Sequence, residues 1–343
     1  MSRAGLIVGV ALSALAALPS AGRAAPHDSG ARPGIGELSP VPSYVRRVLP
    51  AVISIHVTIP RDRPSVQSLG PERWATGVIF DDAAGYALTV SYALIDAERI
   101  EVTLRDGRMV TAALVGLDLE VGVGVIKLQG TGPWPVAALG DSTNVRAGDV
   151  AATVGIGEDG SLVVTSGRVN DVRRFAAAWE YMLDRAFMVS PFNEAFGGGA
   201  LVDVDGRVIG ITSLRVGDAP YVNLAIPMEK FLASRDELCE KGRVVSRQPR
   251  PWLGLYTQSL QGGGLIVAGL SPAGPANAAG VRRGDVIVRL NGERFESQED
   301  FYARLWRGRV GEDVHLVIQR NDRFEAIIVR PADRYRIYRT SDR

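Results

Sequence analysis

The sequence is poor in the side chains that form disulfides, metal sites and imidazole-assisted active sites. It contains one cysteine, Cys239, and only three histidines in 343 residues. A single cysteine excludes an intrachain disulfide, so stability must come from core burial. Scattered histidines beside one cysteine lack the spacing of a ligand set, and we predict neither a metal site nor a cofactor.

The sequence also lacks an excess of charge of one sign. Its 39 basic and 38 acidic residues leave a formal net charge of +1. This balance gives no reason to expect nucleic acid or an anionic membrane as the main partner. Hydrophobic residues make up 46% and charged residues 22% of the chain, which is typical of a globular protein with room for two or three domains.

The N-terminal apolar run is too short to cross a membrane comfortably, which takes roughly 20 residues. Arg3 precedes this run, Gly5–Leu18, and small residues follow it as far as Ala25. The order of charge, apolar run and small residues predicts a cleaved signal peptide over residues 1–25, and hence export to the periplasm or another extracytoplasmic space. An uncleaved membrane anchor stays open as the alternative. Residues 26–43, rich in Gly, Pro, Ser and Ala, are predicted to form a flexible leader.

From Tyr44 the sequence changes to short apolar segments separated by Gly, Asp and Asn turns, a pattern typical of β-sandwiches and barrels. We predict one unit over residues 44–241, with a helix over Met228–Lys241 at its end. Its predicted strands are Ala51–Ile59, Thr76–Phe80, Ala87–Val90, Ile100–Leu104, Gly124–Leu128, Val150–Val154, Leu162–Val164, Leu201–Val204, Val208–Ile211 and Tyr221–Ile226.

A second, smaller unit is predicted over residues 251–333. A basic, Pro-containing linker over 242–250 precedes it, and a charged, frayed tail over 334–343 follows it. Within this unit, Ser297–Leu305 is predicted to be a helix with Ser297 as its N-cap. A strand that ends in the Asn291-Gly292 turn is expected within Gly280–Gly292, and further strands are expected at Val314–Gln319 and Ala326–Val329.

Several short blocks stand out along the chain: Pro50–Ile55, Leu139–Ser142, Ala147–Asp149, Val164–Gly167, Gly198–Ile211, Asn223–Pro227, Trp252–Leu255 and Ala279–Gly292. In their common order and spacing, these blocks resemble those of HtrA-type serine proteases. This resemblance implies a mostly β fold, with a trypsin-like double β-barrel followed by a small α+β PDZ domain.

The chain departs from the family at all three catalytic positions. In Leu88–Leu94, which matches the family's Leu-Thr-x-x-His motif, the general base is replaced by Tyr92. Gly122 stands where the motif has its aspartate. In Ala195–Leu201, which matches the Gly-Asn-Ser-Gly-Gly-Pro-Leu motif, Gly197 replaces the nucleophilic serine.

Acyl transfer on this fold needs a hydroxyl activated by an imidazole that a carboxylate orients. A glycine offers no nucleophile, and tyrosine, with a pKa of about 10, is a poor base at neutral pH. Phe196 also replaces a small polar residue in the oxyanion loop. We therefore predict no catalytic residues. An active HtrA-type endopeptidase that uses unorthodox residues, such as Ser91 or Ser190, is the open alternative. His56 alternates along a strand with Ser54 and is predicted to be structural.

The resemblance implies that the PDZ unit binds peptide or protein C-termini. Leu253, Gly254 and Leu255 would form the loop that captures the terminal carboxylate, while Phe301 and Leu305 would shape the pocket for the last side chain. Helical spacing alone leaves it open whether these two residues are groove or core. The function expected is an adaptor, chaperone or regulator, with an active HtrA relative as a further partner and a homotrimer as the oligomeric state.

Overall fold

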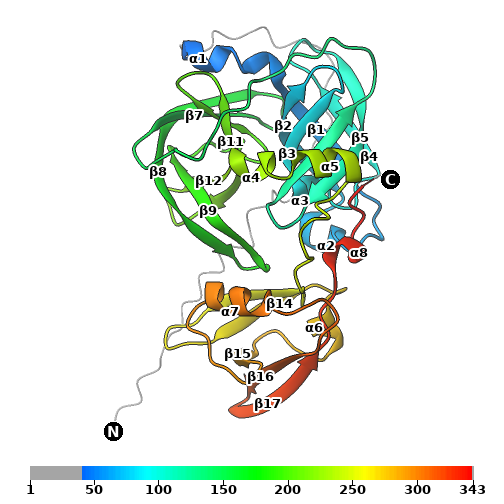
Figure 1. Ribbon diagram of the computed structural model, residues 1–343, viewed down its shortest axis with the longest axis vertical. Coiled ribbons are helices and arrows are strands. Elements are labelled where there is room, and N and C mark those ends of the chain that lie inside the picture. Colours follow the sequence, from blue (N-terminus) through cyan, green and yellow to red (C-terminus); the bar gives the residue numbers. More distant parts are fainter. Residues whose placement is uncertain (1–40, 342–343) are drawn as a thin grey trace, which may run out of the picture. The chain divides into compact units, whose positions relative to one another are not determined.

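The computed structural model describes residues 41–341 (Figure 1). The predicted signal peptide and all but the last residues of the predicted leader lie outside this range. Two closed β-barrels and a five-stranded sheet with helices follow one another along the described chain. The predicted fold class, mostly β with a double barrel followed by a small α+β unit, is confirmed.

Six antiparallel strands close the first barrel in the order β1-β2-β3-β6-β5-β4. In β1, Ile53, Ile55 and Val57 are fully buried while the residues between them are half-exposed, so alternate side chains fill the barrel. The strands are β1 (Val52–Thr58), β2 (Glu72–Asp81), β3 (Tyr86–Val90), β4 (Arg99–Thr103), β5 (Met109–Asp118) and β6 (Val123–Leu128). The short helices in this part are α1 (Ser43–Arg46), η1 (Leu49–Ala51), α2 (Val66–Leu69) and α3 (Ser91–Leu94).

The second barrel has the order β10-β11-β12-β9-β8-β7. Its strands are β7 (Val150–Ile156), β8 (Leu162–Ala177), β9 (Tyr181–Ser190), β10 (Ala200–Asp203), β11 (Val208–Val216) and β12 (Val222–Pro227). β8 and β9 form a long hairpin, and its turn spans Ala178–Glu180. The sequence predicted only the first residues of β8 and neither β9 nor β5.

One helix was predicted over Met228–Lys241, but the structure has two, α4 (Met228–Leu232) and α5 (Arg235–Lys241). The break falls at Ser234, whose hydroxyl donates to the carbonyls of Lys230 and Phe231. Its backbone has φ −123° and ψ −1°, outside the helical region. A serine that bonds to the preceding turn competes with helix continuation, which explains the interruption.

The C-terminal unit is a sheet of order β13-β14-β15-β16-β17, so β13 is an edge strand. The predicted cap is confirmed, because the Ser297 hydroxyl accepts from the Asp300 N–H at the start of the second helix. The strands are β13 (Leu255–Ser259), β14 (Leu265–Leu270), β15 (Val286–Leu290), β16 (Val314–Arg320) and β17 (Arg323–Val329). The helices are α6 (Pro275–Ala278), α7 (Gln298–Leu305) and α8 (Arg334–Ile337).

The prediction of a frayed tail was wrong for the described residues after 333. The Tyr335 hydroxyl accepts a hydrogen bond from the Leu119 N–H at 3.0 Å. The Arg339 N–H donates to the Asp96 carboxylate at 2.8 Å. The Asp96 N–H in turn donates to the Arg339 carbonyl. Composition alone suggested fraying, but these backbone and side-chain bonds fix the tail on the first barrel.

Candidate functional site

Tyr92 and Gly197 lie side by side where the family motif places its base and nucleophile. Tyr92 is on α3, and its hydroxyl donates to the Ser213 carbonyl on β11 at 2.9 Å. A Cβ added to Gly197 would lie 3.1 Å from that hydroxyl. The Gly197 carbonyl accepts from the Thr76 N–H at 2.7 Å, which joins the loop to the first barrel.

The Tyr92 phenol is a poor base for a chemical and a geometric reason. Burial raises the pKa of Tyr92 above its ordinary value of about 10. The neutral phenol is therefore favoured, and its proton is already donated to Ser213. At position 197 no side chain exists from which a proton could be taken. The pair cannot supply the proton transfer that activates a serine nucleophile.

Gly122, the third position, is covered by an aromatic side chain. Its carbonyl accepts from the Ser91 N–H at 2.9 Å, so it lies beside Tyr92 in the fold. Its φ is +94°, in the left-handed region. A Cβ there would lie 2.8 Å from the Tyr181 hydroxyl oxygen and 3.1 Å from a ring carbon of the same side chain. Tyr181 is held in place because its hydroxyl donates to the Val121 carbonyl at 2.6 Å.

In the loop that would form an oxyanion hole, one backbone N–H already donates a hydrogen bond within the protein. In a serine protease, the N–H groups of the nucleophile and of the residue two before it bind the developing oxyanion. The corresponding N–H of Ala195 donates to the Asn193 side chain at 2.9 Å. Asn193 is buried and is held by Asn223, whose side chain bonds to its N–H and its carbonyl. The Phe196 ring packs against Phe192, with 5.7 Å between ring centroids.

The C-terminal unit presents three consecutive backbone N–H groups to a single carboxylate. Leu253 donates to one oxygen of Glu180 at 2.8 Å, while Gly254 and Leu255 donate to the other at 2.7 and 2.8 Å. Gly254 has φ +81°, which allows the tight turn that aims the three amides the same way. The three residues predicted as a carboxylate loop thus lie together and contact a carboxyl group.

Comparison with known proteins gives consistent matches along the chain. Residues 75–211 match the trypsin-like peptidase domain, and residues 251–329 match the PDZ domain. The probable periplasmic serine endoprotease DegP-like of Halomonas elongata is 31% identical over 291 residues, covering 79% of this chain and 59% of that protein. Serine endoprotease DegS of Escherichia coli is 28% identical over 344 residues, covering 93% of each chain. The structure of the HtrA-type protease AlgW with tripeptide has a TM-score of 0.53 at 27% identity, covering 85% of this chain and 97% of that one.

The chain combines a trypsin-like peptidase domain with one PDZ domain and is similar to HtrA-type serine proteases over most of its length. It spans 59% of the length of the Halomonas protein and 60% of serine protease Do-like HtrA of Bacillus subtilis. The Halomonas protein and DegQ of Escherichia coli are described by name as periplasmic. Within residues 41–341, no helix is long and apolar enough to span a membrane.

Ser190, one of the two serines named as alternatives, and two acidic residues close to Gly122 are each bonded to other partners. The Ser190 hydroxyl accepts from Asn170 at 2.6 Å. Asp118 forms an ion pair with Arg247 in the segment before the PDZ domain. Glu120 pairs with the same arginine and with Arg250, at 3.3 and 3.1 Å.

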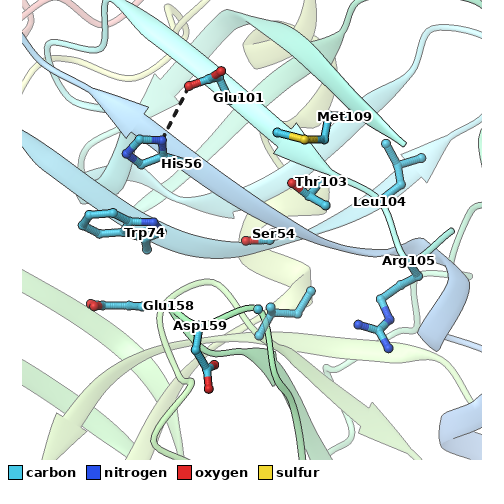
Figure 2. A pocket seen from close by; sticks show the side chains of 12 residues that line it. Ser54, His56, Trp74, Glu101, Thr103, Leu104, Arg105, Met109, Glu158 and Asp159 are labelled. Carbon is cyan, nitrogen blue, oxygen red and sulfur yellow. Dashed lines mark ion pairs between the residues drawn. The ribbon is translucent and has the colours of Figure 1, made fainter. Parts of the chain in front are cut away.

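An open pocket of about 330 Å³ lies between the first barrel and the β7–β8 turn, and His56 forms part of its wall (Figure 2). The imidazole stacks on Trp74 at 4.8 Å between centroids and contacts Glu72 at 2.7 Å and Glu101 at 3.6 Å. Across residues 41–341, neither histidine is hydrogen-bonded to a serine or threonine hydroxyl, and no group of three or more His, Cys, Asp or Glu is placed to hold a metal. None of the three degenerate positions lines this pocket.

The two helix residues proposed for the PDZ pocket lie in the core of that domain. Phe301 is 0% exposed and Leu305 is 2% exposed, both within its hydrophobic cluster. Tyr302, on the same helix, instead reaches the β8–β9 hairpin, where its hydroxyl donates to the Ala177 carbonyl at 2.7 Å. The helix thus contributes core packing, and its Gln298 and Tyr302 side chains form hydrogen bonds to the hairpin.

Glu180 and Tyr181 were both missed by the sequence analysis. Glu180 is the last residue of the β8–β9 turn and contacts the PDZ loop. Tyr181 is the first residue of β9 and covers Gly122. The only local sign was a single acidic residue among Ala and aromatic residues in a stretch that was not assigned to a strand. Their partners are more than 55 residues away in the sequence, so local patterns could not reveal them.

Proposed function

We propose that this protein is an exported, non-catalytic HtrA-type protein that binds the carboxyl ends of peptides or unfolded proteins through its PDZ domain. It would act as an adaptor, chaperone or regulator, with an active HtrA relative as a candidate partner. The observation that carries the proposal is the convergence of the Leu253, Gly254 and Leu255 amides on one carboxylate.

The Leu253–Leu255 loop and the edge strand β13 form the proposed PDZ groove. They have the two features that recognition of a peptide C-terminus needs. Aligned backbone amides bind a carboxylate through charge-assisted hydrogen bonds, which are about twice as strong as neutral ones. An edge strand offers unpaired backbone groups to an added strand, and β13 lies at the edge of its sheet directly after the amide loop. A free C-terminus supplies both an extended backbone and a carboxylate at its end.

The degenerate triad supports a role without peptide-bond hydrolysis. Tyr92, Gly122 and Gly197 offer no nucleophile, no imidazole and no carboxylate at the three positions. Loss of the nucleophile alone lowers turnover on the order of a million-fold in a serine protease. The relatives are named as endoproteases, so an endopeptidase with an unorthodox catalytic set is the competing function that activity measurements must exclude.

The remaining proposals concern organisation and location. The order of charge, apolar run and small residues supports a signal peptide over 1–25 and a leader over 26–43, and the periplasmic relatives support the same destination. We propose a barrel domain over 44–241, a linker over 242–250, a PDZ domain over 251–333 and a tail over 334–343. A homotrimer remains the proposed assembly, from the family resemblance.

A peptide-binding experiment tests the proposed function. The full chain is incubated at pH 8 with a fluorescein-labelled decapeptide library, randomised at its last four positions, with either free or amidated C-termini. Peptides with a free carboxylate are expected to bind at least about tenfold more tightly by fluorescence anisotropy, because amidation removes the charge that the loop amides recognise. Binding that is indifferent to amidation would contradict the proposal.

A pair of glycine variants tests whether the peptides bind at the Leu253–Leu255 loop. Gly254→Ala is expected to abolish binding, since an added Cβ would lie 2.6 Å from the Gly274 backbone and would distort the amide loop. Gly284→Ala is the matched control, because its φ of +93° is as strained for alanine but its Cβ would meet nothing within 4 Å. Retained binding by the first variant would place the peptide elsewhere.

A further inference from the structure

The tip of the β8–β9 hairpin occupies the groove proposed to bind peptides. Glu180, at the tip, is 1% exposed and has φ +54°, which non-glycine residues rarely adopt. An acidic residue is seldom buried without a partner, and a strained backbone persists only where surrounding contacts hold it. Both observations indicate that the bonds from the PDZ loop fix this turn.

The Glu180 carboxylate takes the place of a peptide's terminal carboxylate. It accepts from all three amides of the predicted loop, at 2.7 to 2.8 Å. Burial raises the pKa of Glu180 to about 7, whereas the three amides and Arg334 favour the charged form and lower it. At pH 8 the carboxylate is therefore ionised, as a free C-terminus also is.

The backbone of the tip also follows the path of an added strand. The Thr257 N–H of the edge strand β13 donates to the Ala178 carbonyl at 2.8 Å. On the side of α7, Gln298 and Tyr302 both donate to the Ala177 carbonyl, at 3.1 and 2.7 Å. Backbone pairing with an edge strand and carboxylate capture by a loop are the two contacts that define peptide addition to a PDZ sheet.

We propose that residues 177–181 form an internal ligand of the PDZ groove, so that a peptide C-terminus binds only by displacing the Glu180 carboxylate. This inference rests on the proposed function of the groove and adds its regulation. A peptide C-terminus competes with the hairpin tip for the same amides and the same strand edge.

The test compares the full wild-type chain with Glu180→Ala at pH 8. Hydrogen exchange of peptides spanning residues 251–258 reports on the loop amides without any ligand. The free-carboxylate decapeptide library reports on binding. Glu158→Ala, which removes a carboxylate from the exposed β7–β8 turn, is the matched control, and circular dichroism verifies folding of each variant.

We expect Glu180→Ala to speed exchange at Leu253–Leu255 and to raise library affinity about tenfold. That factor corresponds to a wild-type groove that is closed in roughly nine-tenths of molecules, since apparent Kd varies inversely with the competent fraction. Glu158→Ala is expected to match the wild type in both measurements.

The outcomes separate this inference from the proposed function. Equal affinity of the wild type and Glu180→Ala, or unchanged exchange at the loop, would overturn the internal ligand while leaving peptide binding intact. If neither chain binds the library, the proposed function fails, and exchange alone then decides the inference: faster exchange in Glu180→Ala supports an internal contact, and identical exchange refutes it.

Discussion

The triple variant Tyr92→His, Gly122→Asp, Gly197→Ser is expected to remain at least about 10⁴-fold below an active HtrA-type protease in digestion of fluorescent casein. At position 197 an added Cβ would contact only the Tyr92 hydroxyl, at 3.1 Å, and Tyr92→His removes that hydroxyl. At position 122 the added Cβ would lie 2.8 Å from the hydroxyl of Tyr181, which the triple variant keeps. An imidazole without an oriented carboxylate loses about 10⁴ in turnover. The φ of +94° adds a strain of about 1–3 kcal/mol for aspartate.

A fourth substitution tests whether Tyr181 is responsible. Adding Tyr181→Ala clears the space over position 122, so the quadruple variant is expected to exceed the triple variant in casein turnover. Gly197→Ser alone, where an added Cβ meets only the Tyr92 hydroxyl, serves as the folded control without a base. Turnover by the triple variant close to that of an active protease would refute our description of this site.

Asp118→Ala is expected to destabilise the protein by about 3 kcal/mol. Its carboxylate is fully buried, accepts the N–H groups of Glu120 and Val121, and pairs with Arg247. Removing one partner of a buried ion pair leaves the other partner and the backbone donors uncompensated, which typically costs about 3–5 kcal/mol. Because Arg247 is 35% exposed, we expect the lower end of that range. Thermal unfolding should show a fall in Tm of roughly 5 °C or more.

An exposed ion pair provides the control for this effect. Asp171 lies 3.3 Å from Arg173, and both side chains are more than half exposed. Asp171→Ala should change stability by less than about 1 kcal/mol, as surface pairs generally do. Equal losses in the two variants would show that burial of Asp118 does not stabilise the loop before Gly122.

The sequence was sufficient to predict a β fold because most core strands carry a clear apolar pattern, and the resemblance of its motif blocks supplied the double barrel, although β5 and β9 were missed. In β1, for example, Ile53, Ile55 and Val57 are buried, while Ser54 and His56 between them are half-buried. The motif spacing also located Tyr92 and Gly197, which the structure brings together. These features depend on local pattern or on motif order, and both can be read along one chain.

The β8–β9 hairpin could not be predicted in the same way. Most residues of β8 are exposed or half-buried, so charged positions such as Arg173 and Arg174 interrupt any alternation of apolar side chains. The importance of Glu180 arises from amides 73 to 75 positions later in the chain. Only the folded arrangement shows that an acidic turn residue meets a carboxylate-binding loop.

Reaction with a fluorophosphonate probe tests the central claim most directly. The purified full chain is incubated with the probe beside an active HtrA-type protease, and adducts are counted by intact-mass spectrometry. With no activated serine near Tyr92 and Gly197, we predict no adduct on this protein while the active protease is fully labelled. Stoichiometric labelling of a serine in this chain would contradict the account.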